Sequence, residues 1–330
     1  MQSRELYDLI EQQLGAALLK LEYLAHVPGT AIDEFLQELH HLLSSSTATI
    51  SKSLVDDILK SNNIQVDESI IGDIATAVCS ATPVQKSLQK GGSLSTSYQR
   101  RRFYTQKFGV VEPVTHVLNA KEKHTFQYVP ILKSLQHILR SQSVVEKLVK
   151  NHRGAQHTQP DEFHEYKTPQ DGTLYQKNSF LNNNELRISL SLYVDDFETC
   201  NPLGTSKRKH KLCAVYWILN NLPPGSHSSL STIYLAILSK ADHIKNYGYA
   251  KTFKPLLQDL KILEDQGVYI PLLGKSLKGT VHSVVADNLG AHSLAEFQES
   301  FSADYYCRQC TAKSCDVQHH CFIRCIWPKN

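Results

Sequence analysis

Two stretches of alternating apolar and polar residues, each with an aspartate at its end, most constrain how this chain folds. The first covers residues 186–196 and the second covers residues 280–287. Alternation with a period of two is typical of a β-strand with one buried face, so each stretch predicts a strand that carries a carboxylate at its C-terminal end. Two such strands, if adjacent, would hold a hydrated Mg²⁺ or Mn²⁺ between Asp195 and Asp287.

The segments between these aspartates predict further strands and helices. Residues 210–222 and 229–238 are rich in β-branched and aromatic residues, and prolines lie at the end of the first segment. Residues 251–266 have apolar residues at helical spacing before Gly267, and residues 288–301 predict a second helix. This order predicts an α/β fold with a ribonuclease H-like mixed sheet, in which a three-strand meander is followed by a helix, a parallel strand and a helix.

Four short motifs follow one another across residues 171–310. They are an acid before Asn-Pro-Leu-Gly at 201–204, Leu-Pro-Pro at 222–224, Asp287 before Asn-Leu-Gly-Ala-His, and Cys-x-x-Cys at 307–310. Their joint occurrence in this order resembles the core of CACTA (En/Spm-like) DDE-type DNA transposases. The resemblance implies a DNA partner, metal-dependent phosphodiester hydrolysis with strand transfer, and a nuclear location.

The resemblance assigns catalysis and Mg²⁺ or Mn²⁺ binding to Asp195 and Asp287. Two extra residues separate the first acid from Asn201, so Asp196 is the alternative, although it would face the opposite side of the strand. The third acid of such enzymes should follow the Cys-x-x-Cys motif. Asp316 is the only Asp or Glu among the residues after Cys310. We therefore expect an incomplete site and no DNA cleavage, as in a truncated or transposon-derived copy.

The Cys-x-x-Cys motif also has the spacing of a zinc knuckle, with Cys307 and Cys310 as two ligands. Five further candidates follow within the tail: Cys315, His319, His320, Cys321 and Cys325. Without a matching second pair, a Zn²⁺ site and two free thiols both remain open.

Two basic clusters are candidate nucleic-acid contacts. Arg100, Arg101 and Arg102 lie between aromatic residues, a combination that suits phosphate contact and base stacking. The second cluster consists of Lys207, Arg208, Lys209 and Lys211. A solvated turn is the alternative for each cluster, and a net charge of +3 gives no general basic signal.

The N-terminal residues predict an all-α region, because apolar residues recur at helical spacing on both sides of a polar break at 44–47. These helices lack a basic face, which favours a scaffold over a DNA-end-binding domain. A linker is expected at Gly91-Gly92-Ser93 and a helix at 128–148. The expected parts are a helical region (1–90), a linker plus helical segment (91–184), a ribonuclease H-like transposase core (185–306) and a zinc-knuckle-like tail (307–330).

Composition is that of a globular protein. The 330 residues, 41% hydrophobic and 20% charged, allow two domains with a sizeable core. No apolar run approaches the roughly 20 residues of a membrane span, and no secretory signal is present, so we expect an intracellular protein with no membrane partner. A homo-oligomer is left open. The alternative function is a catalytically inactive, domesticated DNA-binding or protein-interaction module.

Overall fold

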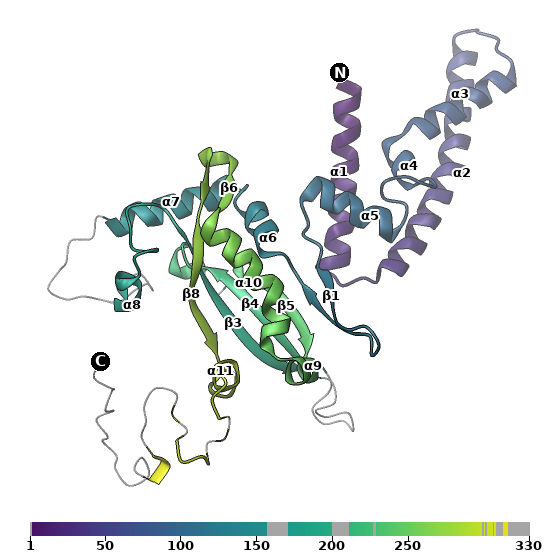
Figure 1. The fold of residues 1–330 in the computed structure, drawn as a ribbon. Helices are drawn as coiled ribbons and strands as arrows, with labels where there is room; N and C mark the ends of the chain where they lie inside the picture. The colour runs from purple at the N-terminus through teal and green to yellow at the C-terminus, as the bar shows by residue number, and fades with distance from the viewer. Residues whose placement is uncertain are drawn as a thin grey trace. The chain divides into compact units, whose positions relative to one another are not determined.

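The computed structural model describes residues 2–156, 171–199, 211–226, 229–298, 300, 302–305, 307 and 313–315. The chain divides into two compact units, Met1–Val110 and Val111–Asn330, called here the N-terminal unit and the C-terminal unit (Figure 1).

The N-terminal unit is built from helices, as expected. They are α1 (Gln2–Tyr23), α2 (Gly29–Ser61), α3 (Glu68–Ala81), α4 (Pro83–Leu88), α5 (Ser97–Phe103) and the π-helical turn η1 (Tyr104–Phe108). A core of buried residues joins α1, α2, α4, α5 and η1: Leu18, Ile32, Leu36, Leu88, Leu94, Phe103 and Tyr104.

Two predictions for this unit were wrong. Helix α2 runs without the expected break at 44–47. The linker expected at Gly91-Gly92-Ser93 is instead a tight turn inside the unit. Gly92 lies so close to the carbonyls of Lys86 and Ser87 that a Cβ would clash, and the Leu94 amide donates to the Ser87 carbonyl at 3.0 Å. A Gly-Gly pair thus serves a close backbone approach here.

A six-stranded mixed sheet forms the C-terminal unit, in the order β1-β2-β5-β4-β3-β8. Strands β3 (Ile188–Glu198), β4 (Lys211–Leu219) and β5 (Tyr234–Lys240) pair antiparallel with one another, and β8 (Gly279–Ala286) pairs parallel with β3. The prediction that these four strands share one sheet, as a meander followed by a parallel strand, is confirmed.

The other edge of the sheet was not predicted. Strands β1 (Val114–Asn119) and β2 (His124–Tyr128) form a hairpin, and β2 pairs antiparallel with β5. The helix expected at 128–148 is therefore wrong at its start. It is two helices, α6 (Ile131–Ile138) and α7 (Gln142–Gln156), which follow the end of β2.

Helix α10 (Tyr249–Asp265) crosses one face of the sheet, as expected (Figure 1). Its buried residues Phe253, Leu256, Leu260 and Leu263 belong to the same core as β3 and β4. The helix ends before Gly267, whose φ of +78° suits glycine, as the sequence predicted. The remaining elements are α8 (Thr173–Lys177), η3 (Pro224–Ser226), η4 (Leu230–Thr232), α9 (Ala241–Tyr247), β6 (Val268–Ile270), η5 (Pro271–Leu273), β7 (Lys275–Leu277) and α11 (Asn288–Leu294).

Candidate functional site

The register of β3 and β8 brings the two predicted acids to the same level of the sheet. Val194 pairs with Ala286 at the end of the parallel ladder. Asp195 and Asp287 are the next residue on each chain. They follow a pair of residues whose strands lie about 4.8 Å apart. Both residues also line one cavity. The structure therefore places the two aspartates directly after the last paired residues of adjacent strands.

Strand alternation separates Asp195 from Asp196. Asp196 lies opposite the buried Cys213 in the ladder, and its Oδ2 is 3.0 Å from Lys211 Nζ. Asp195 is on the other side, where its Oδ2 accepts a hydrogen bond from the Tyr193 hydroxyl at 3.1 Å. The first choice of acid, Asp195, thus shares its face with Tyr193, and the alternative acid already has a cationic partner.

Asp287 also begins helix α11. Its Oδ1 accepts a hydrogen bond from the Gly290 amide at 2.5 Å, the arrangement of an N-cap. Asp287 therefore has a structural role as the cap of this helix. This role is compatible with a metal role, because a carboxylate that caps through one oxygen can bind a cation through the other.

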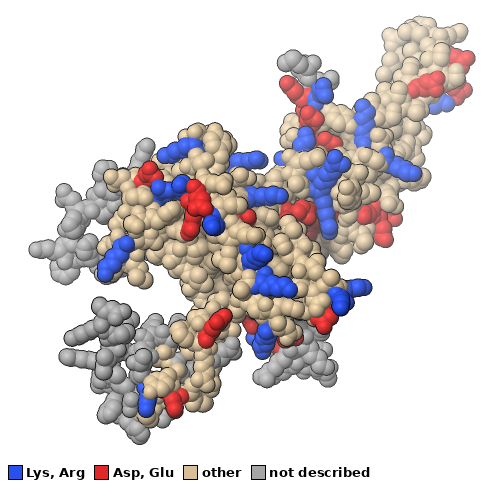
Figure 2. Space-filling view, viewed as in Figure 1, with Lys and Arg blue, Asp and Glu red and all other residues tan. Residues whose placement is uncertain are grey.

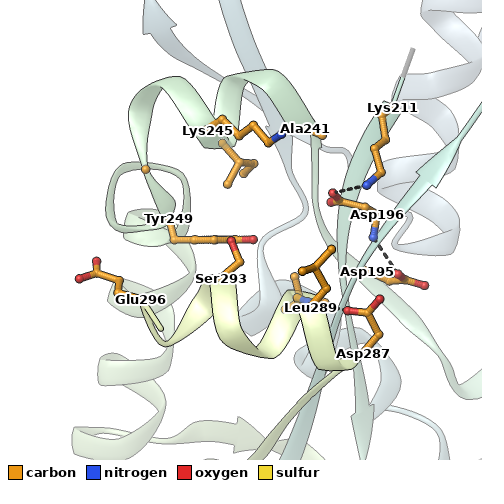
Figure 3. A pocket seen from close by; sticks show the side chains of 14 residues that line it. Asp195, Asp196, Lys211, Ala241, Lys245, Tyr249, Asp287, Leu289, Ser293 and Glu296 are labelled. Carbon is orange, nitrogen blue, oxygen red and sulfur yellow. Dashed lines mark hydrogen bonds and ion pairs between the residues drawn. The ribbon is translucent and has the colours of Figure 1, made fainter. Parts of the chain in front are cut away.

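A cavity of about 430 Å³ opens at this edge of the sheet. Figure 3 shows the side chains of Lys245 and Tyr249 on one side of it and those of Asp195, Asp196 and Asp287 on the other, with the Asp195 carboxylate directed away from Lys245 and Tyr249. Lys211 lines the same cavity, and its pKa is raised by the hydrogen bond to Asp196 and by the charges of Asp196, Asp287 and Asp195. The cavity therefore combines carboxylates with two lysines, an arrangement suited to a cation and a phosphate together.

The negative charge of Asp195 and Asp287 also affects Tyr193. Its pKa is raised mainly by the hydrogen bond to Asp195 and further by the charges of Asp195 and Asp287. Both carboxylates thus act on one phenol, which agrees with their placement beside each other. Cys213, opposite Asp196, is a core residue, and burial raises the pKa of its thiol.

The donor set fits part of a divalent-metal site. Two carboxylates suit Mg²⁺, which takes one or two such ligands and fills its other positions with water and phosphate oxygens. Neither Asp195 nor Asp287 forms an ion pair with a Lys or Arg among the described residues. Across that same part of the chain, no group of three or more His, Cys, Asp or Glu side chains is arranged to hold a metal ion. Asp195 and Asp287 therefore form only a partial donor set for such an ion.

Arg100 does not have the predicted role. Its side chain is fully buried in the N-terminal unit, where Nη1 lies 2.7 Å from Asp33 Oδ1 and Nε lies 2.9 Å from Glu22 Oε1. A guanidinium enclosed by two carboxylates has no access to a nucleic-acid phosphate, so the prediction of a nucleic-acid contact was wrong for Arg100. Its neighbours Arg101 and Arg102 are exposed and remain candidates.

The second basic cluster is described only in part. Lys211 is half-exposed and paired with Asp196, whereas Lys207, Arg208 and Lys209 lie outside the described residues. On the face shown in Figure 2, lysines and arginines lie interspersed with acidic residues rather than gathered in one broad basic patch. Of the zinc candidates, Cys307 is half-buried and Cys315 is exposed; Cys310, His319, His320, Cys321 and Cys325 lie outside the described residues.

Sequence reasoning missed Lys245 as a residue of the cavity. Helix α9 starts directly after β5, which runs in the same direction as β3 because both are antiparallel to β4. The C-terminal ends of β3, β5 and β8 therefore meet at one edge of the sheet, and Lys245 lies just over one turn into the helix. Strand direction was the signal that could have identified it.

Comparisons with known proteins add no assignment. No family model matches the chain, and no curated protein is significantly similar to it. In the part of the chain that the structure describes, no helix has the length and apolar character needed to cross a membrane.

Proposed function

We propose that this chain derives from a DDE-type DNA transposase of the CACTA (En/Spm-like) kind and that Asp195 and Asp287 are two of its catalytic acids. The observation that carries the proposal is the register of β3 and β8, which brings the two strand-end aspartates to adjacent positions. The strand order β5-β4-β3-β8, antiparallel except for its last pair, agrees with the ribonuclease H-like core that such enzymes use.

The ancestral reaction is metal-dependent hydrolysis and strand transfer of DNA phosphodiesters. At such a site a bound Mg²⁺ or Mn²⁺ supplies Lewis-acid polarisation of the phosphate and activation of the attacking water or 3′-hydroxyl. Asp195 and Asp287 would hold the ion from adjacent strands, and Lys211 and Lys245 would contact phosphate oxygens in the same cavity. Tyr193, which donates to Asp195, would fix the orientation of that carboxylate.

Asp196 and Glu296 also line the cavity, but no three acids of the described residues are arranged together to hold a metal ion. Two carboxylates can hold one ion, but two-metal phosphoryl transfer needs further ligands for the ion at the leaving oxygen. We therefore propose that the chain binds DNA in the nucleus without cutting it. A catalytically inactive, domesticated DNA-binding module is the second candidate, and the exposed Arg101 and Arg102 are the observation in its favour.

Plasmid nicking tests the proposal. Purified chain is incubated with supercoiled plasmid and Mn²⁺, beside Asp287→Asn and the control Asp265→Asn, which removes an exposed carboxylate from the end of α10. We expect no nicking above background and DNA binding that weakens steeply with salt. Nicking that Asp287→Asn abolishes and Asp265→Asn retains would show a complete catalytic site and refute the inactive assignment. Absence of DNA binding at low salt would refute both candidates.

A further inference from the structure

The hairpin of α2 and α3 exposes apolar side chains that no other described part of the N-terminal unit covers. On α2, Ile50, Leu54 and Ile58 are 56–60% exposed, and on α3, Ile70, Ile74 and Val78 are 41–51% exposed. Ile64, 51% exposed, lies in the connection between the two helices. The residues of each helix are four apart, so each row forms one stripe. We call the six helical residues the hairpin face.

Both stripes lie on the same side of the hairpin. The helices run antiparallel, because Lys52 pairs with Glu68 at 2.8 Å while the Cys79 thiol lies 3.8 Å from the Leu43 carbonyl. Each exposed residue of α3 directly precedes a buried one; the buried residues are Ile71, Ala75 and Cys79. On α2 the exposed residues likewise precede partly buried ones: Ser51, Val55 and Leu59. One residue back along a helix corresponds to a rotation of about 100° around its axis, away from the buried residue. On two antiparallel helices that pack against each other, this rotation carries both stripes to the same side of the pair.

The acidic charge of the hairpin excludes nucleic acids and anionic membranes as binding partners of this face. Residues 51–79 contain five carboxylates and two lysines. Both lysines form ion pairs within the hairpin, Lys52 with Glu68 and Lys60 with Asp56. Figure 2 shows the surface of this hairpin as mostly uncharged, with acidic groups near its end. An acidic element with an apolar face fits an apolar protein surface.

We infer that the hairpin face is the interface of a homodimer, in which two hairpins pack face to face as a four-helix bundle. A two-fold interface uses the same patch on both copies, and this face is apolar on both of its helices, so it is complementary to itself. With about half of each side chain exposed, the face and Ile64 offer roughly 600 Å² per copy, close to the ~800 Å² that each partner buries in a standard interface. Each helix is then buried on two sides, against its partner in the hairpin and against the second copy, as helices in such bundles are.

Sedimentation velocity of the full chain over a range of concentrations tests this inference, which does not depend on the proposed catalytic ancestry. We expect a monomer–dimer equilibrium whose Kd rises by about 100-fold or more in Leu54→Glu and in Ile74→Glu, because each places a charge in an apolar interface. The matched controls Ser53→Glu and Thr76→Glu add the same charge at exposed positions outside the hairpin face and should leave the Kd unchanged.

Two further variants guard against misfolding as the cause. Leu54→Ala and Ile74→Ala retain helix propensity, and we expect each to raise the Kd by about tenfold with unchanged far-ultraviolet circular dichroism. A chain that stays monomeric at all concentrations would overturn the inference. So would a dimer that the four face variants leave intact, since its interface would then lie elsewhere.

Discussion

Replacing Arg100 by methionine should strongly destabilise the N-terminal unit. The arginine is fully buried, and its guanidinium donates to Asp33 and Glu22 at 2.7 and 2.9 Å. It also reaches the carbonyl of Gly29, so it ties α1 and α5 to the start of α2. Arg100→Met removes the cation and leaves both partly buried carboxylates without it.

The expected cost follows from the burial of the partners. Removing one member of a buried ion pair typically costs about 3–5 kcal/mol, because the remaining charge is left uncompensated. The side chains of Glu22 and Asp33 are 11% and 28% exposed, so water can solvate them in part. We therefore expect the lower end of the range, about 3 kcal/mol, a large share of the 5–15 kcal/mol that stabilises a typical domain.

Hydrogen exchange read by mass spectrometry measures this loss within the N-terminal unit of the full chain. At about 1.4 kcal/mol per factor of ten, protection of the slowest amides of α1 and α2 should fall roughly 100-fold in Arg100→Met. Arg101→Met and Arg102→Met, which change exposed neighbours, should stay within about 0.5 kcal/mol of the parent chain. Adding Glu22→Gln and Asp33→Asn to Arg100→Met should restore part of the protection. Unchanged protection in Arg100→Met would refute the assignment of a buried, structural arginine.

Three further predictions concern the C-terminal unit. Burial lowers the pKa of His243, so this histidine binds a proton more tightly in the unfolded chain than in the folded one. The free energy of unfolding should therefore fall as pH drops below about 6.5. In His243→Gln, the thermal-unfolding midpoint should depend less on pH between about pH 7 and 5. Tyr128→Phe removes the hydroxyl that donates to Asp259 at 2.7 Å and should cost about 1–3 kcal/mol in urea unfolding, whereas the exposed Tyr269→Phe should cost almost nothing. Lys211→Met removes a cation beside the aspartates and should tighten Mn²⁺ binding in a calorimetric titration; weaker binding would contradict the electrostatic reasoning.

The central strands were predictable because their sequence pattern and their structure share one cause. β3 and β4 each have a buried face, and burial imposes the apolar periodicity that marks a strand. β8 lies at the edge of the sheet and is mostly half-buried or exposed, and its valines marked it as a strand. Strand direction then followed from connection length, since a helix separates β5 from the parallel strand β8. The positions of Asp195 and Asp287 could be predicted for the same reason, because the pairing of two strands fixes where the residues at their ends lie.

Other elements carried misleading local signals. The serines of residues 44–46 suggested a break in α2, but their hydroxyls donate to carbonyls one turn earlier, at 2.7 Å from Ser44 to His40 and 2.5 Å from Ser46 to Leu42. Such bonds satisfy polar side chains inside a helix and leave no trace in the composition. The β1–β2 hairpin was missed because its turn has no glycine; Asn119 accepts from the amides of Lys121 and Glu122 instead.

The arginine cluster shows what a sequence does not contain. Arg100, Arg101 and Arg102 are identical in type and adjacent, yet only the first is enclosed by acids from α1 and α2. Those acids lie more than 60 residues away in the chain, and no local pattern links them. Which arginine is structural therefore depended on tertiary contacts. The cavity residue Lys245 was missed for a similar reason, since its place follows from the sheet order.

Mn²⁺ binding measured by electron paramagnetic resonance tests the central claim most directly. Asp287→Asn removes charge while retaining a good N-cap for α11, which separates the metal role from the capping role. We predict one Mn²⁺ bound per chain, with a Kd that rises by about tenfold or more in Asp195→Asn and in Asp287→Asn and stays unchanged in the control Asp265→Asn. Equal Mn²⁺ affinity in the parent chain and in both site variants would contradict shared coordination by Asp195 and Asp287.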